Sequence, residues 1–487
     1  MSLLVLVLAV SSAYAQDDDW AKKVLESQNQ SLKEYEEFRQ QALKDYESFR
    51  QQANADYAEF MLKAWKSYEP LPEEEFPWLP KPPQPVVAEP VTHPTSDPIV
   101  FEGQPIPPKP LETQPQPLEP IVFTPRDDEP VEYEYFFGTP LAFHIDKERP
   151  VLHLNDVSEK SVAALWKQLS DPFYDNLIAE CLQHRKDKNL SDWAYVMLTE
   201  MVAESYCGGH TNEAVVMHMY LLTQSGYQMR MGKAENRLCV LVGSNEKIYH
   251  YKFFMIDGVR YYNFDLAAED KPMSIFDHAF PNEKVMSLMM TQPKLFVETT
   301  EPRTIVSKRY PDVSVTVEMN RNLIDFYNSC PLSAQWCYYS AASLSETVKE
   351  DLYPALRKAI EGKSQADAAN ILLNMVQTGF RYATDQEQFG YERPLYPDET
   401  FFYPYCDCED RAILYSCLMR ELLGLDAVLL NYPEHLATAV CFTDEVAGDY
   451  LTIEGKKYVI CDPTYIGAEI GRCMPDLKTV MPKVEKL

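Results

Sequence analysis

The chain has 487 residues, enough for two or three domains, and a formal net charge of −29 at pH 7. A nucleic-acid-binding protein needs a basic face, and this sequence shows none. The same acidity disfavours binding to anionic membrane surfaces. After the first few residues, no stretch reaches the roughly 18 apolar residues of a transmembrane helix. The composition therefore predicts a soluble globular protein without a transmembrane span.

Residues 1–15 have the pattern of a secretory signal peptide. An apolar run from Leu3 to Val10 precedes the small-x-small sequence Ala13-Tyr14-Ala15, and cleavage would fall before Gln16. The alternative is an ordinary apolar N-terminus. We expect an exported protein, either periplasmic or extracellular. Its eleven cysteines are an odd number, which favours at least one unpaired thiol. No spacing of Cys and His predicts a metal site, and we expect no cofactor.

Residues 16–68 are expected to form a helical segment with an eleven-residue repeat. Four tyrosines are spaced eleven apart, at Tyr35, Tyr46, Tyr57 and Tyr68. Eleven residues make almost three helical turns, so the tyrosines share one face, and a sustained repeat of this length favours a right-handed supercoil. Two interpretations stay open: the stripe forms an oligomer or docks a partner, or it packs on its own protein.

Residues 69–130 are expected to form a linker. They hold 19 of the 36 prolines, and this density favours an extended, semi-rigid chain. The sequence Pro-Ile-Val-Phe occurs twice, starting at Pro98 and Pro120, which hints at two short docking strands. The sequence favours the simpler interpretation, a spacer in which this repetition is accidental.

Residues 131–300 are expected to form a first globular domain and residues 301–487 a second. The predicted elements of the first are a strand at Glu132–Phe137, helices at Val157–Leu169, Asp192–Ser205 and from His210 to about Ser225, and strands at Leu238–Val242, Ile248–Ile256 and Val259–Phe264. Those of the second begin with a strand at Val313–Met319 and helices at Leu352–Ile360 and Gln365–Thr378. A 27-residue loop from Arg381 to Asp407 follows, rich in aromatic residues, which is expected to wall a substrate groove or to pack as a compact loop.

The strongest chemical signal follows this loop. Apolar residues recur at helical spacing from Ala412 to Leu423, and Gly424 stands where a helix would end, so Cys408 is expected in the first turn. The unpaired N–H groups at a helix start favour the thiolate, which is the nucleophilic form of cysteine. His435 is expected at the start of a strand and Asp462 at the end of the next one. Cysteine, histidine and aspartate supply a nucleophile, a base and a group that orients the base.

These residues resemble the transglutaminase-like superfamily of papain-like α+β folds. The similarity lies in Asp-Cys-Glu-Asp-x-Ala at a helix start, His-x-Ala-x-Ala-Val on a strand, and Asp-Pro-Thr-Tyr after the next strand, and it covers roughly residues 310–475. It implies a catalytic triad of Cys408, His435 and Asp462. Cys406 departs from the pattern, because relatives often have glycine there. The superfamily includes transglutaminases, proteases, amidases and inactive members.

The chemistry that the resemblance implies is acyl transfer through a thioester on Cys408. The N–H of Cys408 would donate to the oxyanion, and Gln386 and Gln388 are candidates for the second donor that relatives usually add. We expect hydrolysis of a peptide or amide bond in a protein or peptide substrate, because bulk water outcompetes amines unless the site excludes it. A glutamine amine transferase, a non-catalytic binding or scaffold protein, and an assembly protein remain alternatives.

The first domain is expected to be a degenerate copy of the second. A shift of 197 or 198 residues aligns several positions, for example Gly226 with Gly424, which indicates an internal duplication. In this alignment the triad positions are taken by His210, Arg237 and Asp265, so neither nucleophile nor base is retained. The alternative is an unrelated α+β domain with a similar order of elements.

Overall fold

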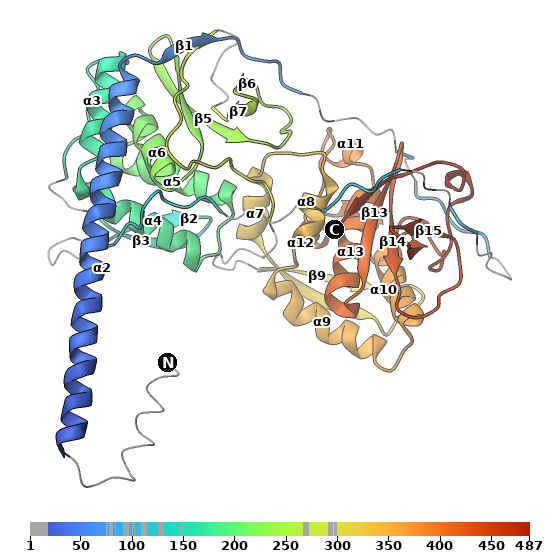
Figure 1. The fold of residues 1–487 in the computed structure, drawn as a ribbon. Helices are drawn as coiled ribbons and strands as arrows, with labels where there is room; N and C mark the ends of the chain where they lie inside the picture. Colours follow the sequence, from blue (N-terminus) through green and yellow to red (C-terminus); the bar gives the residue numbers. More distant parts are fainter. Residues whose placement is uncertain are drawn as a thin grey trace.

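The computed structural model has two globular bodies joined along one side, with a long helix projecting from the first (Figure 1). It describes residues 18–74, 76, 81–82, 84–90, 97–99, 101, 103–108, 114–124, 131–145, 149–265, 272–290, 296 and 300–487. Helices account for 39% and strands for 23%, so the fold is α+β as expected. The predicted signal peptide lies outside the described residues. Within them, no helix has the length and apolarity needed to cross a membrane.

The long helix α2 (Asp18–Met61) is anchored to the first body by its C-terminal third. Arg50 forms an ion pair with Asp175, and the Asn54 amide bonds to Gln224. Tyr57 is buried, with its ring centroid 4.9 Å from that of Trp166. The preceding aromatic residues of the stripe are exposed. Figure 1 shows that this part of α2 extends away from the body. The repeat therefore packs on its own protein at one end and faces solvent at the other.

The predicted helix does not continue to Tyr68. Residues Trp65–Tyr68 form strand β1, which pairs antiparallel with β8 (Met273–Phe276). The edge of β8 offers this segment a row of backbone partners from far away in the sequence. Tertiary pairing overrides a local pattern that continued the helical repeat.

The first body has a six-stranded antiparallel sheet in the order β1-β8-β4-β5-β7-β6. Its remaining strands are β4 (Met229–Ala234), β5 (Arg237–Ser244), β6 (Phe253–Ile256) and β7 (Val259–Asn263). Its helices are α3 (Glu159–Leu169), α4 (Asp175–Asp187), α5 (Asp192–Cys207) and α6 (Asn212–Gln224), and a hairpin is formed by β2 (Val131–Phe136) and β3 (Thr139–His144). The strand predicted from Ile248 starts only at Phe253, while α4 was not predicted.

The second body has a five-stranded antiparallel sheet in the order β15-β16-β14-β13-β17. Its strands are β13 (Asp426–Tyr432), β14 (His435–Cys441), β15 (Tyr450–Ile453), β16 (Lys456–Cys461) and β17 (Lys483–Lys486). Before them come the hairpin β9 (Thr300–Val306) and β10 (Ser314–Asn320), and helices α7 (Arg321–Ser329), α8 (Trp336–Ala341), α9 (Glu346–Ile360) and α10 (Gln365–Gly379). Helix α13 (Cys408–Leu418) lies against β13 and β14.

The two sheets share one strand order. The sequence β8-β4-β5-β7-β6 in the first corresponds to β17-β13-β14-β16-β15 in the second, and every neighbouring pair is antiparallel. Strands β13 to β16 each start 197 or 198 residues after β4 to β7. The packing does not divide at residue 300, because Leu323, Phe326 and Tyr327 of α7 belong to the core of the first body.

The described parts of the proline-rich segment are docked on the protein, so the spacer interpretation is wrong for them. We refer to the described residues between Glu69 and Pro108 as the strap. Backbone bridges join Leu71 to Phe253, Val87 to Ile466, Pro98 to Tyr450 and Ile106 to Glu485. Ile99, in the first Pro-Ile-Val-Phe, is buried and donates its N–H to the Tyr450 carbonyl at 2.7 Å. The strap therefore crosses from the first body over the second.

Candidate active site

Cys408 is the first residue of α13, as the sequence predicts. The helix start is fixed by Asp410, whose carboxylate accepts the N–H groups of Asp407 and Leu395 at 3.1 and 2.9 Å. The helix continues as a short π-helical turn and ends at Gly424, which adopts a left-handed conformation with φ of 64°. Asp410 thus stabilises the helix start.

His435 and Asp462 form a buried pair. His435 is the first residue of β14, and Asp462 directly follows β16, which pairs with β14. The His435 Nε2 lies 2.9 Å from Asp462 Oδ2. The other carboxylate oxygen accepts the N–H groups of Thr464 and Tyr465, so the carboxylate is held in place. Within the described residues, Nδ1 of His435 makes no hydrogen bond.

The Cys408 thiol lies beside the start of β14 but does not contact the His435 ring. Its Sγ donates to Glu409 Oε2 at 3.2 Å. Burial and the Glu409 carboxylate raise the thiol pKa well above its usual value, while Lys81 and the N–H of Leu436 act in the opposite direction. The structure therefore brings the helix start close to the histidine strand, with the thiol in its protonated form.

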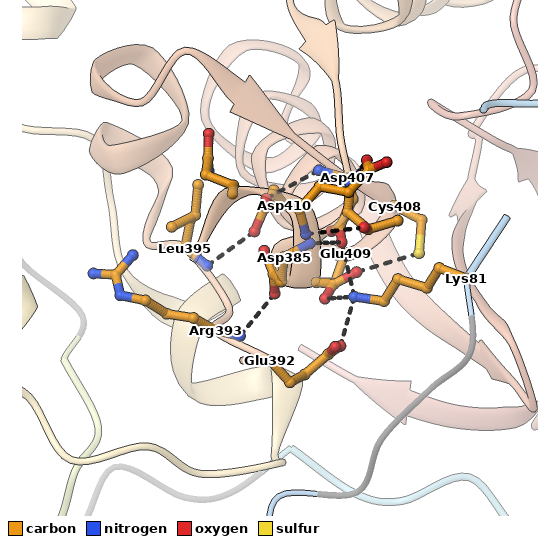
Figure 2. A network of polar contacts seen from close by, with 12 residues as sticks. Lys81, Asp385, Glu392, Arg393, Leu395, Asp407, Cys408, Glu409 and Asp410 are labelled. Atoms are coloured by element: carbon orange, nitrogen blue, oxygen red, sulfur yellow. Dashed lines mark hydrogen bonds and ion pairs between the residues drawn. The ribbon is translucent and has the colours of Figure 1, made fainter. Parts of the chain in front are cut away.

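A buried cluster of carboxylates surrounds this helix start (Figure 2). We call it the carboxylate cluster; its members are Asp385, Glu392, Asp407, Glu409 and Asp410. Among the described residues, one cation forms ion pairs with it: Lys81 of the strap. The Lys81 Nζ lies 2.5 Å from Glu392 and 2.9 Å from Asp407, and it also contacts Glu409. The strap thus supplies the positive charge of the site.

The pKa values in the cluster reflect crowding of like charges. Burial and the Asp407 charge raise the pKa of Asp385 well above its usual range, and burial and Glu409 do the same for Asp407. Burial and Asp407 raise the pKa of Asp410 to about 7. Burial opposes the charge of Lys81, but Glu409 and Asp407 raise its pKa well above normal. The cluster therefore retains protons at neutral pH, with Lys81 charged.

Several acidic groups have the spacing of metal ligands. Ligand atoms within 4.8 Å of one another occur in three overlapping sets, namely Asp385 with Glu392 and Glu409, Asp385 with Asp407 and Asp410, and Asp407 with Cys408 and Glu409. A further set is Glu200, Glu204 and His210 on the first body. The Lys81 ammonium lies among the carboxylates of the main site. Its positive charge therefore compensates their negative charge, as a bound metal ion would.

The strap also covers the thiol. Phe76 belongs to the same apolar cluster as Cys408 and Leu436, with its ring centroid 6.1 Å from that of Trp336. Cys408 is 2% exposed. Farther along, the Pro82 carbonyl accepts the Tyr382 hydroxyl at 3.0 Å. The sequence contains no signal for these contacts, because Phe76 and Lys81 stand in a proline-rich stretch typical of a solvated spacer.

The two glutamines proposed as oxyanion donors lie on the short helix α11 (Asp385–Gln388). The amide of Gln388 is engaged by Tyr405, whose N–H donates to its Oε1 at 3.0 Å and whose carbonyl accepts from its Nε2 at 3.2 Å. Gln386 is exposed. Gln386 is therefore the one with an unengaged amide, within the described residues.

Cys406, the second thiol of the motif, lies in a different environment. It belongs to the large core of the second body, whereas Cys408 belongs to the cluster beneath Phe76. The Arg411 guanidinium donates to its sulfur at 3.4 Å. Burial raises its pKa to about 11, although Arg411 acts against this.

The structure also brings together the three corresponding positions of the first body. Arg237 and Asp265 form an ion pair at 3.0 Å, and His210 Nε2 lies 3.8 Å from the same carboxylate oxygen. His210 also contacts Glu204 at 2.6 Å. The side chains of His210 and Arg237 are about half exposed, unlike the buried Cys408 and His435. These three positions therefore lie together in space.

Comparison with protein-family models, with curated proteins and with solved structures gave no match to this chain.

We predict that stability falls as the pH rises towards 7. Asp410 keeps its proton up to about pH 7 in the folded protein, but it loses it near pH 4 when unfolded. The folded state therefore binds more protons between these values, and each such group lowers the unfolding free energy by up to about 1.4 kcal/mol per pH unit. The urea midpoint should decrease from pH 5 to pH 7, less steeply in Asp410→Asn. The exposed Asp444→Asn is the control, and an unchanged slope in Asp410→Asn would contradict the assignment.

Proposed function

We propose that this chain is an exported cysteine-dependent acyl-transfer enzyme of transglutaminase-like type, which hydrolyses a peptide or amide bond through a thioester on Cys408. The observation that carries the proposal is the His435–Asp462 pair at 2.9 Å, next to the helix start that holds a cysteine. Asp462 fixes the ring through Nε2. That arrangement leaves Nδ1 as the nitrogen that can accept the thiol proton.

The reaction runs in two steps. Nδ1 of His435 takes the thiol proton, the thiolate attacks the carbonyl carbon, and the N–H of Cys408 donates to the oxyanion. The C–N bond breaks, the leaving amine takes the proton from His435, and a thioester remains. Water then loses a proton to His435 and attacks the thioester, which releases the acid and returns the proton to the thiol. Gln386 and Gln388 are the candidates for a second oxyanion donor.

The described state is a closed form of this enzyme. The thiol donates to Glu409, which Lys81 contacts, and Phe76 belongs to the apolar cluster that buries Cys408. A substrate carbonyl has no approach to Cys408 while the strap is in place. Catalysis therefore requires that the strap move and that the thiol turn from Glu409 towards His435.

The two bodies are proposed to be tandem copies of one fold, the first degenerate. The shared strand order and the constant shift of four strands support this duplication. The clustering of His210, Arg237 and Asp265 supports it independently. With no thiol among these three residues, the first copy would bind substrate or position the second.

The competing function is a non-catalytic binding module. It is favoured by the buried Cys408 with its raised pKa, since an unreactive structural cysteine has the same properties. The two functions differ in how the thiol behaves once the strap is loosened, and this difference is the basis of the following experiments.

Removal of the Phe76 ring should expose Cys408. In Phe76→Ala we expect alkylation of Cys408 by iodoacetamide, followed by peptide mass spectrometry, to be at least tenfold faster than in the wild type. Phe101→Ala is the matched control, because Phe101 is also a strap aromatic but packs on another cluster. Equal rates in the two variants would mean that the strap does not gate the thiol.

The histidine dependence of the reaction tests catalysis itself. In the Phe76→Ala background, iodoacetamide should alkylate Cys408 at pH 6. His435→Ala should abolish the alkylation at pH 6 but leave the alkylation at pH 9 unchanged. His153→Ala, an exposed histidine on the first body, is the control. The same pH profile with and without His435 would refute the proposal.

A product analysis separates hydrolysis from amine transfer. New peptide termini after incubation with a peptide mixture indicate hydrolysis, whereas attachment of an added amine to glutamine side chains indicates a glutamine amine transferase.

The projecting part of α2 supports a second role, association with another copy of the chain. Its exposed aromatic residues follow the eleven-residue repeat: Tyr35, Phe38, Tyr46 and Phe49. An exposed stripe of this kind marks an interaction surface, and a repeated stripe is complementary to itself.

Charges placed on the stripe should dissociate the oligomer. We expect light scattering to show an oligomer for the wild type and a monomer for Tyr46→Lys/Phe49→Lys. The control Ser48→Lys/Gln51→Lys adds the same charge to the opposite face of α2 and should leave the oligomer intact. A wild-type monomer at micromolar concentration would contradict this role.

A further inference from the structure

A cavity of about 940 Å³ opens beside the strap. Strap residues Gln84, Pro85 and Val87 form one wall. The other lining residues come from β9 and the turn after it, the end of α10, the connection before α13, α13 itself and the segment after β16. Its charged lining residues are Arg303, Lys308, Arg381 and Arg411. No aspartate or glutamate is among the described residues that line it. The charged residues of this groove are thus all cations, although the chain as a whole has a net charge of −29.

Two of these cations are fixed in the wall without a carboxylate partner in the described chain. The Arg411 side chain is 1% exposed and donates to the carbonyls of Gln377 and Phe380 at 3.4 and 3.2 Å. Arg303 donates to the Phe401 carbonyl at 2.8 Å and also to that of Tyr403. Carbonyl groups satisfy the N–H donors but do not cancel the positive charge.

The other two cations are exposed and make no ion pair within the described residues. Arg381 and Lys308 line the cavity and are exposed, so water and ligands reach them. Burial and the neighbouring charge of Arg381 lower the pKa of Arg303. Like charges held close together raise the free energy of the empty groove, and an anion bound between them relieves this cost.

We propose that this groove is a substrate subsite that binds an acidic peptide segment through its carboxylate side chains. Arginine and lysine side chains around a groove several residues long suit a series of carboxylates.

A chain of contacts joins the groove to the candidate active site. Tyr382 lines the groove, and its hydroxyl donates to Pro82 of the strap. The preceding strap residue, Lys81, contacts Glu409, which in turn accepts from Cys408. A peptide bound along Arg381 and Tyr382 thus leads towards the thiol, and the subsite selects substrates with acidic residues on one side of the reacting carbonyl. The identification of the ligand as substrate rests on the proposed function; binding itself does not.

Binding is measured with full-length Cys408→Ala protein, so that the result is independent of catalysis. The probes are fluorescein-labelled hexaglutamate and hexaglutamine, followed by fluorescence anisotropy at low and high salt. We expect hexaglutamate to bind, to weaken as salt increases, and to bind at least tenfold more weakly to Lys308→Glu/Arg381→Glu.

The matched control is Lys358→Glu/Lys363→Glu, which makes the same change in net charge on exposed lysines that do not line the groove. It should bind hexaglutamate like the parent. Equal affinity for both peptides, or equal loss in the control, would overturn the subsite. Binding of inorganic phosphate without hexaglutamate would also overturn it, in favour of a site for a small anion. Peptide binding, together with a Cys408 in Phe76→Ala whose alkylation does not depend on His435, would refute the proposed function and leave the subsite standing.

Discussion

The ion pairs of Lys81 hold the active-site half of the molecule in its described form. Five buried carboxylates meet at the start of α13, and the ammonium group that contacts three of them comes from a segment more than 300 residues earlier. Loss of one partner from a buried ion pair costs about 3–5 kcal/mol, because the other charge is left uncompensated. The strap is therefore part of the fold of the second body, even though most of its sequence has the composition of a linker.

The position of Lys81 on the strap has two opposite effects on the pKa of the Cys408 thiol. Lys81 lowers the thiol pKa by its charge, while the strap that carries it buries the thiol and raises that pKa. When the strap leaves, water reaches the sulfur, but the carboxylates of Glu409 and Asp407 lose their cation. In the proposed mechanism the thiolate would then be stabilised by the imidazolium of His435, by the helix start and by the N–H of Leu436. If Cys408 is catalytic, its thiolate therefore depends more strongly on His435 than the thiolate of a cysteine in a basic pocket would depend on its histidine.

The sequence predicted the local parts of the site and missed those that depend on distant packing. The helix beginning at Cys408 and ending at Gly424, and the strands that carry His435 and precede Asp462, follow from periodicity and turn residues nearby. The position of the strap follows from none of these. Proline density predicts an extended chain, but the surface on which that chain lies is decided by partners such as Ile466 and Tyr450, hundreds of residues away. Strand β1 was missed for the same reason, because its partner β8 also lies far away in the sequence.

The largest difference between the two bodies lies in the connection before the helix of the site. In the first body four residues separate α5 from α6, whereas in the second 28 residues separate α10 from α13. This longer connection carries Asp385 and Glu392 of the carboxylate cluster. It also carries Arg381 and Tyr382 of the basic groove. With a connection of four residues, the first body has no room for either feature, and its corresponding residues lie open to solvent. The proposed chemistry of the second body thus depends on this longer connection as much as on the sheet, and strap residues Lys81 and Pro82 contact the connection.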